Sequence, residues 1–592
     1  MKGGIFPNGK MTVKMFKLAK RYLGAVRKEI IIGQSAKLTE AIFEVIVPLI
    51  MANIVDKGIN GGLGKPYILK MGGILVLLGA LGLAFALICQ YLASKASQSV
   101  GTVIRSDMFR HINTLSHSEL DRLGTPSLIT RLTNDINQVE RAVAMFIRLV
   151  VRAPFIVIGS AVMAMSINLK MSIIFVVIMP LVALVLYLIM SRSVKYYKVI
   201  QKKLDRISLV TREGLSGVRV IRAFSRQDTE RKRFGDANDE YLDISLRVGR
   251  LSALLNPLTY VILNLSIAFI VYYGGTLVNI GDLTQGEVIA FVNYMTQISL
   301  ALVVVANLVV LFTKAAASSA RINEVLETKP SIVSGTAAEG TNSENAVEFT
   351  HVYFSYNGSS EYALEDINFT AKKGETIGII GGTGSGKSTL ASLIPRFYDI
   401  TKGELKIDGI NADEYDTQAL RGNIGTVPQK AVLFSGTVAE NMRWGKRDAT
   451  DGEIMSALET AQAKEFVDKM PDGLKTHISQ GGKNLSGGQK QRLTIARALV
   501  SRPKILILDD SASALDFATD AALRKAVAGI KDMTVFIISQ RANSVMQADK
   551  IIVLDDGKQA GLGTHSELLE SCDIYREICY SQLSKEEVEA NG

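Results

Sequence analysis

The stretch "GGTGSGKST", residues 381 to 389, decides the fold of the second half of the chain. It follows the β-rich run "TIGII", precedes the helical run "LASLIPRFY", and satisfies G-x-x-x-x-G-K-[ST] in the strand, loop and helix context that this motif requires. Glycines let backbone amides curl around phosphate groups, and the helix that follows presents its positive N-terminal end to them. We therefore predict a phosphate-binding loop rather than a chance glycine-rich turn. Its residues are Gly381, Gly382, Thr383, Gly384, Ser385, Gly386, Lys387, Ser388 and Thr389.

Two side chains of this loop and two downstream carboxylates form an expected metal and phosphate site. Lys387 should reach the β- and γ-phosphates, and Ser388 should ligate Mg²⁺. The run "KILILDDSASALD", residues 504 to 516, ends an aliphatic strand on two acids. Such a strand downstream of a phosphate loop places a carboxylate at the metal, so Asp509 is expected to hold Mg²⁺. Asp510 follows at the position where a residue can orient or deprotonate the attacking water.

The composition indicates a membrane protein with a soluble part. The chain has 592 residues, 48% of them hydrophobic, and a formal net charge of +10. Its basic residues concentrate beside apolar segments, which favours the membrane surface over nucleic acid as a partner. The three cysteines, Cys89, Cys572 and Cys579, have no C-x-x-C spacing, so neither a disulfide framework nor a zinc site is expected.

Six apolar segments approach or exceed the roughly 20 residues that a membrane-spanning helix needs. They lie near residues 30–54, 71–95, 147–167, 170–190, 251–274 and 287–312. Two long, polar, helix-favouring segments, 96–146 and 191–250, separate some of these spans. The distribution of Lys and Arg places both long segments, and therefore both termini, in the cytoplasm.

The first residues and the region after the sixth span are expected to lie outside the bilayer. Residues 11–28 put Met15, Leu18, Tyr22 and Val26 on one face, as an interfacial helix would. A soluble amphipathic helix is the alternative. Residues 329–345 are rich in Gly, Ser, Thr and Ala and predict a linker.

Residues 484–499, "NLSGGQKQRLTIARAL", lie between the phosphate loop and the carboxylate strand, and here the chain resembles the ATP-binding cassette superfamily. Leu485 to Gln489 spell the signature motif of that superfamily. A Ser and two glycines before a helix offer a hydroxyl and amides to a second phosphate, although a helix cap would look the same. The resemblance implies a head-to-tail pair of cassettes in which each signature covers the ATP of the other. The signature residues so implied are Ser486, Gly487, Gly488 and Gln489.

Other matches follow the order of that family. The resemblance implies that Tyr356 stacks on adenine, although an ordinary strand tyrosine is possible. It implies that Gln429 senses the γ-phosphate and the metal, and that Asp516 belongs to the loop that communicates between the two ATP sites.

Six spans ahead of a cassette resemble the exporter class with a type IV transmembrane fold, whose coupling helices would fall at 122–135 and 213–224. The expected organisation is multidomain, with an all-α membrane domain followed by an α/β P-loop NTPase domain. The expected parts are an interfacial helix (1–28), a six-helix transmembrane domain with two coupling loops (29–320), a linker (321–345) and a nucleotide-binding domain (346–592).

The chain departs from the family at the catalytic positions. Asp510 stands where fully active members have Glu, Gln540 stands where they have His, and Gln480 stands where exporters commonly have Glu. An aspartate is one methylene shorter, and a misplacement of about an ångström can cost about a hundredfold in rate. Gln540 cannot carry the proton or charge that a histidine can. The pattern resembles the noncatalytic half of a heterodimeric exporter, and a homodimer that tolerates aspartate is the alternative.

Charged residues also fall within the predicted spans. Lys37, Glu40 and Glu44 share one face of the first span, and Arg148 with Arg152 begins the third. Ionisable groups at this depth should face the bundle interior or a water-filled cavity. They form either a polar wall that meets a cationic substrate or ion pairs internal to the protein. Asn256, Pro257 and Asn264 in the fifth span, with Asn293 and Gln297 in the sixth, could add polar lining or serve helix packing.

These expectations together describe an ATP-driven exporter of amphipathic small molecules that uses ATP and Mg²⁺. Its partners would be a second half-transporter carrying Glu and His at the two catalytic positions, membrane lipid and substrate, with no nucleic acid. Its place would be a bacterial inner membrane, with the nucleotide-binding domain in the cytoplasm. A peptide exporter and an ATP-gated regulatory subunit are the alternatives.

Overall fold

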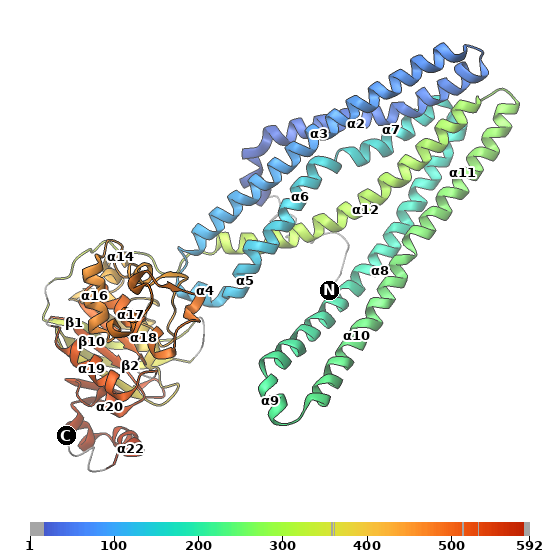
Figure 1. Ribbon diagram of the computed structural model, residues 1–592. Helices are drawn as coiled ribbons and strands as arrows, with labels where there is room; N and C mark the ends of the chain where they lie inside the picture. Colours follow the sequence, from blue (N-terminus) through green and yellow to red (C-terminus); the bar gives the residue numbers. More distant parts are fainter. Residues whose placement is uncertain are drawn as a thin grey trace. The chain divides into compact units, whose positions relative to one another are not determined.

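The computed structural model describes residues 17–341, 343–356, 359, 361–511, 514–530 and 532–584. They form two compact units (Figure 1). The first, here called the membrane unit, comprises residues 17–113 and 125–328. The second, here called the cassette unit, comprises residues 114–124 and 329 onward. Met15 of the expected interfacial helix lies outside the described residues.

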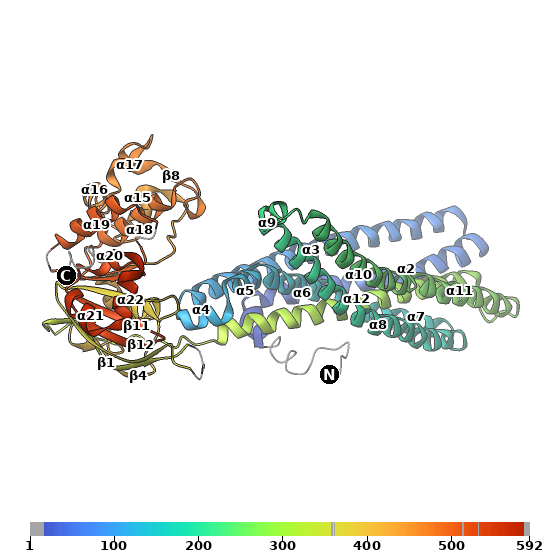
Figure 2. The same cartoon turned by 90° about the horizontal axis from the view of Figure 1, so that it is seen from below.

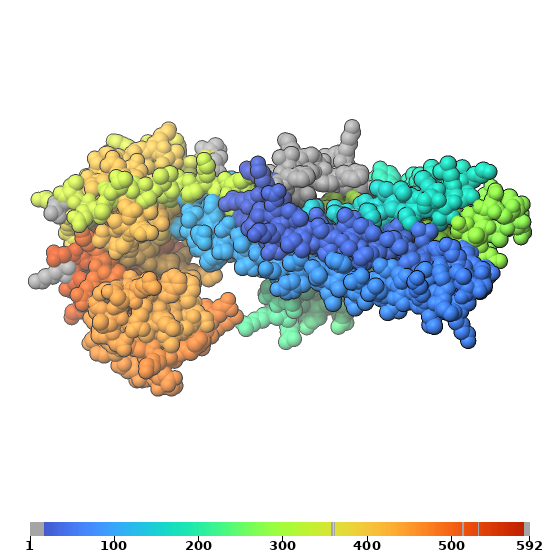
Figure 3. All heavy atoms as spheres, turned by 90° about the horizontal axis from the view of Figure 1, so that it is seen from above, coloured from blue at the N-terminus to red at the C-terminus, as the bar shows by residue number. Residues whose placement is uncertain are grey.

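The membrane unit contains six helical stretches that are long and apolar enough to cross a membrane, counted over the described part of the chain. This number confirms the prediction. The helices are α2 (Arg27–Asn53), α3 (Gly64–Ile112), α6 (Ile136–Leu149) with α7 (Arg152–Ile167), α8 (Leu169–Ser216), α10 (Gln227–Ala253) with α11 (Leu255–Asn279), and α12 (Gln285–Glu327). A π-helical segment, Ile54–Asn60, extends α2. Figure 3 shows the continuous blue surface that the first two spans form.

The core of the membrane unit lies where α7, α8, α11 and α12 meet. Phe175 and Phe291 stack there with ring centroids 5.8 Å apart, and both are fully buried. The buried Tyr294 donates its hydroxyl to the carbonyl of Val45 in α2 at 3.0 Å, which ties the first span to the sixth.

The two long excursions each contain a short helix. α8 and α10 run side by side in opposite directions and are joined by α9 (Val218–Ala223), which lies within the expected segment 213–224 (Figure 1). The first short helix is α4 (His117–Leu123), so the expected position 122–135 was too far along the chain. A capping box of Ser116 and Glu119 starts α4, and Gly124, with φ of 73°, ends it. The chain then returns through α5 (Thr125–Thr130) and a π-helical turn, Arg131–Asp135.

The expected start of the linker at residue 321 was also wrong. α12 continues to Glu327 because Ile322 and Val325 are fully buried against the membrane unit. Arg321 forms an ion pair with the buried Asp135, which fastens the same helical turn.

The cassette unit is built on a ten-stranded sheet with the strand order β5-β4-β1-β2-β12-β11-β3-β10-β9-β6. Its parallel part confirms the sequence prediction and consists of β3 (Thr376–Gly381), β6 (Ile424–Val427), β9 (Ile505–Asp509), β10 (Thr534–Ile538) and β11 (Lys550–Asp555). The antiparallel part was not predicted from the sequence. It consists of β1 (Asn345–Phe354), β2 (Leu364–Lys372), β4 (Lys402–Ile407), β5 (Ile410–Asn411), and β12 (Lys558–Gly563) beside β11.

Helices pack around this sheet. They are α13 (Lys387–Leu393), α14 (Thr417–Gly422), α15 (Val438–Met442), α16 (Asp451–Thr460), α17 (Lys464–Asp468), α18 (Gly487–Val500), α19 (Phe517–Ala528), α20 (Ala542–Val545), α21 (His565–Ser571) and α22 (Asp573–Gln582). Figure 2 shows α15 to α18 gathered to one side of the sheet together with β8 (His477–Ile478), which pairs with β7 (Gly436–Thr437). α18 carries the signature at its N-terminus.

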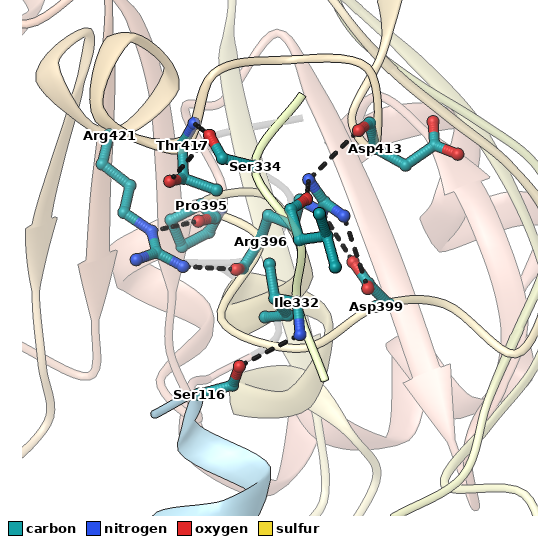
Figure 4. A network of polar contacts seen from close by, with 10 residues as sticks. Ser116, Ile332, Ser334, Pro395, Arg396, Asp399, Asp413, Thr417 and Arg421 are labelled. Atoms are coloured by element: carbon teal, nitrogen blue, oxygen red, sulfur yellow. Dashed lines mark hydrogen bonds and ion pairs between the residues drawn. The ribbon is translucent and has the colours of Figure 1, made fainter. Parts of the chain in front are cut away.

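The segment that leads into the cassette is fastened by hydrogen bonds (Figure 4). The guanidinium of Arg396, which is 4% exposed, donates to the carbonyl of Val333 at 3.1 Å and pairs with Asp399 at 2.6 Å. The backbone N–H of Ile332 donates to the hydroxyl of Ser116 at 3.1 Å. Residues 332 and 333 are therefore tied both to the cassette and to the cap of α4.

Candidate functional site

Four neighbouring parallel strands end at one edge of the cassette sheet. In spatial order they are β3, β10, β9 and β6. Ligands bind beyond the carboxyl ends of such strands. The phosphate loop follows β3, Gln540 lies two residues beyond β10, Asp509 ends β9, and Gln429 lies two residues beyond β6. The sheet order therefore brings together residues that are far apart in the sequence.

These residues line one cavity of about 400 Å³, within the size range of small-molecule sites. The predicted site residues in its wall are Tyr356, Thr383, Gly384, Gly386, Lys387, Ser388, Thr389, Gln429, Asp509, Asp510 and Gln540. Gly381, Gly382 and Ser385 belong to the backbone of the same loop, where the ammonium of Lys387 donates to their oxygens at 2.9, 2.5 and 3.3 Å respectively.

Two positions in the loop require glycine. Gly386 has φ of 95°, and an added Cβ would lie 2.7 Å from a methyl carbon of Leu364. At Gly381 an added Cβ would lie 2.1 Å from the carbonyl oxygen of Leu554. The loop therefore reaches its curled shape because these residues have no side chain.

The expected metal side chains are adjacent. The hydroxyl of Ser388 donates to a carboxylate oxygen of Asp509 at 3.0 Å. Burial raises the pKa of Asp509, and the nearby charge of Asp510 adds to this effect. Burial also lowers the pKa of Lys387, against the opposing effect of the two acids. A hydroxyl, a carboxylate and the amide oxygen of Gln429 are oxygen donors of the kind that Mg²⁺ prefers.

Two of the three departures from the family pattern, Asp510 and Gln540, lie in this cavity. The carboxylate of Asp510 accepts a hydrogen bond from the amide nitrogen of Gln429 at 3.2 Å. Asp510 has φ of 45°, in the left-handed region, and its backbone N–H donates to the carbonyl of Ile538 in β10 at 2.9 Å. The amide oxygen of Gln540 accepts from the hydroxyl of Thr383 at 3.4 Å. Asp510 and Gln540 thus contact the residues expected to surround the γ-phosphate.

Tyr356 lies at the aromatic side of the cavity. It is 40% exposed, and its hydroxyl lies 3.0 Å from the hydroxyl oxygen of Thr389. Its ring meets the ring of Tyr398 edge-on, with centroids 5.3 Å apart. The hydroxyl of Tyr398 in turn donates to Asp121 of α4 at 2.6 Å. A short chain of side chains therefore connects the cavity wall to α4.

Several cavity residues were not predicted from the sequence. They are Tyr362, Ala363, Ile538, Ser539, Asp556 and Gly557. Tyr362 lies in the same β1–β2 connection as Tyr356, and the ammonium of Lys402 lies 5.6 Å from its ring centroid. A second tyrosine in one loop was a signal that could have found it. Asp556 and Gly557 belong to the turn between β11 and β12, which only the sheet topology brings to this edge.

The signature residues lie elsewhere in the cassette unit. Ser486 is the N-cap of α18, and its hydroxyl accepts from the backbone N–H of Gln489 at 3.3 Å. The side-chain oxygen of Gln489 accepts from the backbone N–H of Ser486 at 2.9 Å. Within the described residues, none of the four signature positions lines the cavity. In the single chain they form a capping box, as the alternative interpretation expected.

Gln480 and Asp516 each lie at the start of a helical segment. Gln480 begins a 3₁₀ turn, Gln480–Gly482, that precedes the signature. Asp516 caps α19 by accepting from the backbone N–H of Thr519 at 2.9 Å.

Four of the five charged residues singled out within the predicted spans pair with one another. The ammonium of Lys37 lies 2.6 Å from Glu40, and the guanidinium of Arg152 lies 2.7 Å from Glu44. This favours the interpretation of internal ion pairs. Arg148 forms no ion pair with another described residue.

The polar residues of the fifth and sixth spans also bond within the protein. Gln297 donates to the carbonyl of Glu44 at 3.1 Å and accepts from Ser160 at 3.1 Å, joining three helices. Asn264 and Asn293 each donate to a carbonyl of their own helix, at 2.8 and 2.9 Å.

Two family models match the chain. The model of the ABC transporter transmembrane region matches residues 30–302, and the model of the ABC transporter ATP-binding domain, described simply as "ABC transporter", matches residues 364–513. The first covers five spans and the beginning of the sixth. The second covers most of the cavity residues and the whole signature.

Similar proteins agree over nearly the full length. The uncharacterized ABC transporter ATP-binding protein YfiB of Bacillus subtilis is 38% identical over 553 residues, which cover 93% of this chain and 95% of YfiB. The putative multidrug export ATP-binding/permease protein YgaD of the same species is 32% identical, covering 94% of this chain and 98% of YgaD.

The fold matches a solved structure as well. A bacterial Atm1-family ABC exporter with ATP bound aligns with a TM-score of 0.78 and 23% identity, covering 96% of this chain and all of that one. The cassette unit is accordingly an ATP-binding domain, and the whole is a multi-pass membrane protein. The chain belongs to the ABC transporter family.

Proposed function

We propose that this protein exports amphipathic small molecules across the cytoplasmic membrane, as one half of a heterodimer whose own Walker A/B site hydrolyses ATP slowly. The observation that carries the proposal is the cavity itself. It combines a complete set of side chains for holding nucleotide with Asp510 and Gln540 at the two positions expected to activate water.

Nucleotide binding follows from the cavity wall. The backbone of residues 381–386 and the ammonium of Lys387 would hold the phosphates, and Tyr356 would stack on the adenine. Ser388, Asp509 and Gln429 would hold Mg²⁺, which neutralises charge on the phosphates when bound. Lys387 would leave the carbonyls that it now contacts when phosphate oxygens replace them.

Slow hydrolysis follows from the reach of Asp510. Its backbone is fixed by the bond to β10, and its carboxylate is engaged by Gln429. A shorter acid held in this way cannot approach a water as a glutamate would, and an error of about an ångström costs about a hundredfold. Gln540 offers an amide and no transferable proton. Ser486, Gly487, Gly488 and Gln489 would complete the faster site on the partner.

Export is favoured by similarity and by architecture. YgaD is described as a putative multidrug export protein. The six spans with two cytoplasmic excursions fit an arrangement in which closure of two cassettes switches the substrate pathway between the spans from inside-facing to outside-facing. Both termini and the cassette would lie in the cytoplasm.

Transport can be tested in inverted membrane vesicles that contain this chain, with or without a candidate partner that has Glu and His at the two catalytic positions. We expect ATP-dependent accumulation of the cationic amphipathic dye rhodamine 6G only with both chains present. Full transport by this chain alone would contradict the heterodimer and favour a homodimer that tolerates aspartate.

A regulatory subunit is the second candidate, and Asp510 with Gln540 is compatible with it. A gate lets substrate run only downhill. Accumulation of the dye against its gradient would therefore rule out the gate, and equilibration without accumulation would rule out the pump.

A further inference from the structure

A second cavity lies in the membrane unit, beneath the segment that precedes the first span. Its volume is about 520 Å³. One wall is this N-terminal segment, which includes Leu18 and Tyr22, and the others come from α3, α6 and α12, which contribute Val100, Val143 and Phe312. All three of these helices belong to spanning stretches. Val100 and Val143 lie within about five residues of the predicted span limits at 95 and 147, so the cavity lies at the expected cytoplasmic ends of these spans, beside the bilayer.

The walls and the rim differ in chemistry. The walls are almost entirely aliphatic and aromatic. Lys20 and Arg27 also line the cavity, and both side chains are exposed. Neither forms an ion pair with an acid among the described residues. Two available cations therefore border an apolar chamber.

The neighbouring polar groups are engaged with each other. The hydroxyl of Tyr22 donates to Asp107 of α3 at 3.2 Å, and Lys17 pairs with Glu327 of α12 at 2.6 Å. These contacts hold the N-terminal segment against the bundle, with Leu18, Tyr22 and Val26 buried. The N-terminal segment therefore covers one side of the chamber. Its apolar face, which was expected to meet lipid, packs against the protein instead.

We propose that this cavity holds an acyl chain of an anionic phospholipid from the cytoplasmic leaflet, with Lys20 and Arg27 binding the phosphate headgroup. The occupant follows from charge complementarity: an apolar chamber takes the chain, and two rim cations select a negative headgroup. Basic segments next to a span attract anionic lipids in this way. The choice of leaflet rests on the proposed orientation with the N-terminus in the cytoplasm.

Photocrosslinking tests the site directly. The full-length protein is placed in phosphatidylcholine vesicles that contain a trace of phosphatidylglycerol with a diazirine on its acyl chain, or the matched phosphatidylcholine probe. After irradiation, labelled peptides are identified by mass spectrometry. We expect the phosphatidylglycerol probe to label peptides that contain Val100, Val143 or Phe312, and the phosphatidylcholine probe to label them several-fold less.

Two variants and their matched controls separate the chamber from the rim. Val143→Trp fills the chamber and should abolish this labelling, whereas Val76→Trp, at a position of α3 that is 74% exposed, should not. Lys20→Gln with Arg27→Gln should lower phosphatidylglycerol labelling by roughly tenfold or more. Lys65→Gln with Lys70→Gln removes two exposed charges elsewhere in the unit and should leave it unchanged. The rim variant changes no buried group, so it remains informative if Val143→Trp fails to fold.

Three results would overturn the proposal. Equal labelling by both probes would remove the headgroup preference. Labelling that survives both Val143→Trp and the rim variant would place the lipid elsewhere. Displacement of the probe by excess rhodamine 6G would make this chamber a site for transported amphipaths. Labelling needs neither ATP nor a partner chain, so its failure would leave the proposed export function intact, and a failure of export would leave this site intact.

Discussion

The cassette carries two surfaces that the family uses at ATP, and they are unequally equipped. The cavity at the ends of β3, β10, β9 and β6 has a complete phosphate loop but carries Asp510 and Gln540. The signature at the start of α18 has every expected residue and an intact capping box. In the proposed head-to-tail pair these two surfaces lie at different ATP sites, so the proposal predicts one slow site and one fast site.

The two surfaces also differ in the residues that their side chains contact. The cavity connects through Tyr356 and Tyr398 to Asp121 on α4. The side chains of Ser486 and Gln489 bond to each other's backbone. A cavity that binds ATP without cleaving it could therefore still influence α4.

The largest expected effect comes from a charge placed at the signature. Ser486→Asp keeps an N-cap, since Asp caps helices as well as Ser, but sets a carboxylate where the partner's ATP would place a phosphate. ATP turnover of the assembled pair should fall about 10²-fold to 10³-fold. Lys387→Ala in the chain's own cavity should lower the ATP turnover of the pair clearly less. A larger loss with Lys387→Ala would reverse the comparison.

The next effect comes from repairing the cavity. Asp510→Glu with Gln540→His should raise hydrolysis by the purified chain about a hundredfold, because the longer acid reaches the water and the imidazole can carry a proton. Asp556→Glu lengthens another acid of the same cavity wall and should change nothing. Turnover is measured as released phosphate, and an unchanged rate in the repaired chain would refute the argument from reach.

A smaller effect separates the two roles of Ser486. Ser486→Ala removes the cap and should lower the free energy of unfolding of the cassette by about 1 kcal/mol, as measured by thermal unfolding. Thr564→Ala removes an equivalent capping box at α21 and should cost a similar amount. The signature variant should also slow turnover of the pair, and the α21 variant should not. Equal turnover in both would reduce Ser486 to a helix cap.

The smallest expected effect is a pH dependence of stability that comes from His117 of α4. The ring of His117 stacks on that of Phe397 with centroids 4.5 Å apart, and burial, together with the charge of Arg421, lowers its pKa against the opposing effect of Asp121. The folded state therefore favours neutral His117. Its stabilisation is present above the usual histidine pKa of 6.5 and is lost as the pH falls through the lowered value.

His117→Phe keeps an aromatic ring but cannot titrate. Over about pH 5 to 8, the Tm of the wild-type chain should fall further on acidification than the Tm of the variant. Parallel curves for the two proteins would show that this contact does not respond to pH.

The six spans, the phosphate loop and the two acids at the end of β9 were predictable because each depends on a local pattern of hydropathy or spacing. The bounds of α4 were not, since they depend on the capping box of Ser116 and on the left-handed Gly124, which ends the helix near the start of the segment 122–135 where a coupling helix was expected. The end of α12 was missed because the burial of Ile322 and Val325 depends on distant helices.

Tyr362 and Asp556 were not predicted as cavity residues for a similar reason. Sheet order, which no short pattern encodes, brings the β1–β2 connection and the β11–β12 turn to the same edge. Local chemistry was therefore readable from the sequence, whereas the complete wall of the site was not.

The central claim is that this chain's own cavity holds ATP without cleaving it, and the chemical state of the retained nucleotide tests it most directly. The purified full-length chain is incubated with radiolabelled ATP and Mg²⁺, freed of unbound nucleotide and quenched at intervals, and the bound nucleotide is separated. The account predicts that it remains ATP long after the repaired Asp510→Glu, Gln540→His chain has converted its own to ADP. Equally fast conversion to ADP in both proteins would contradict it.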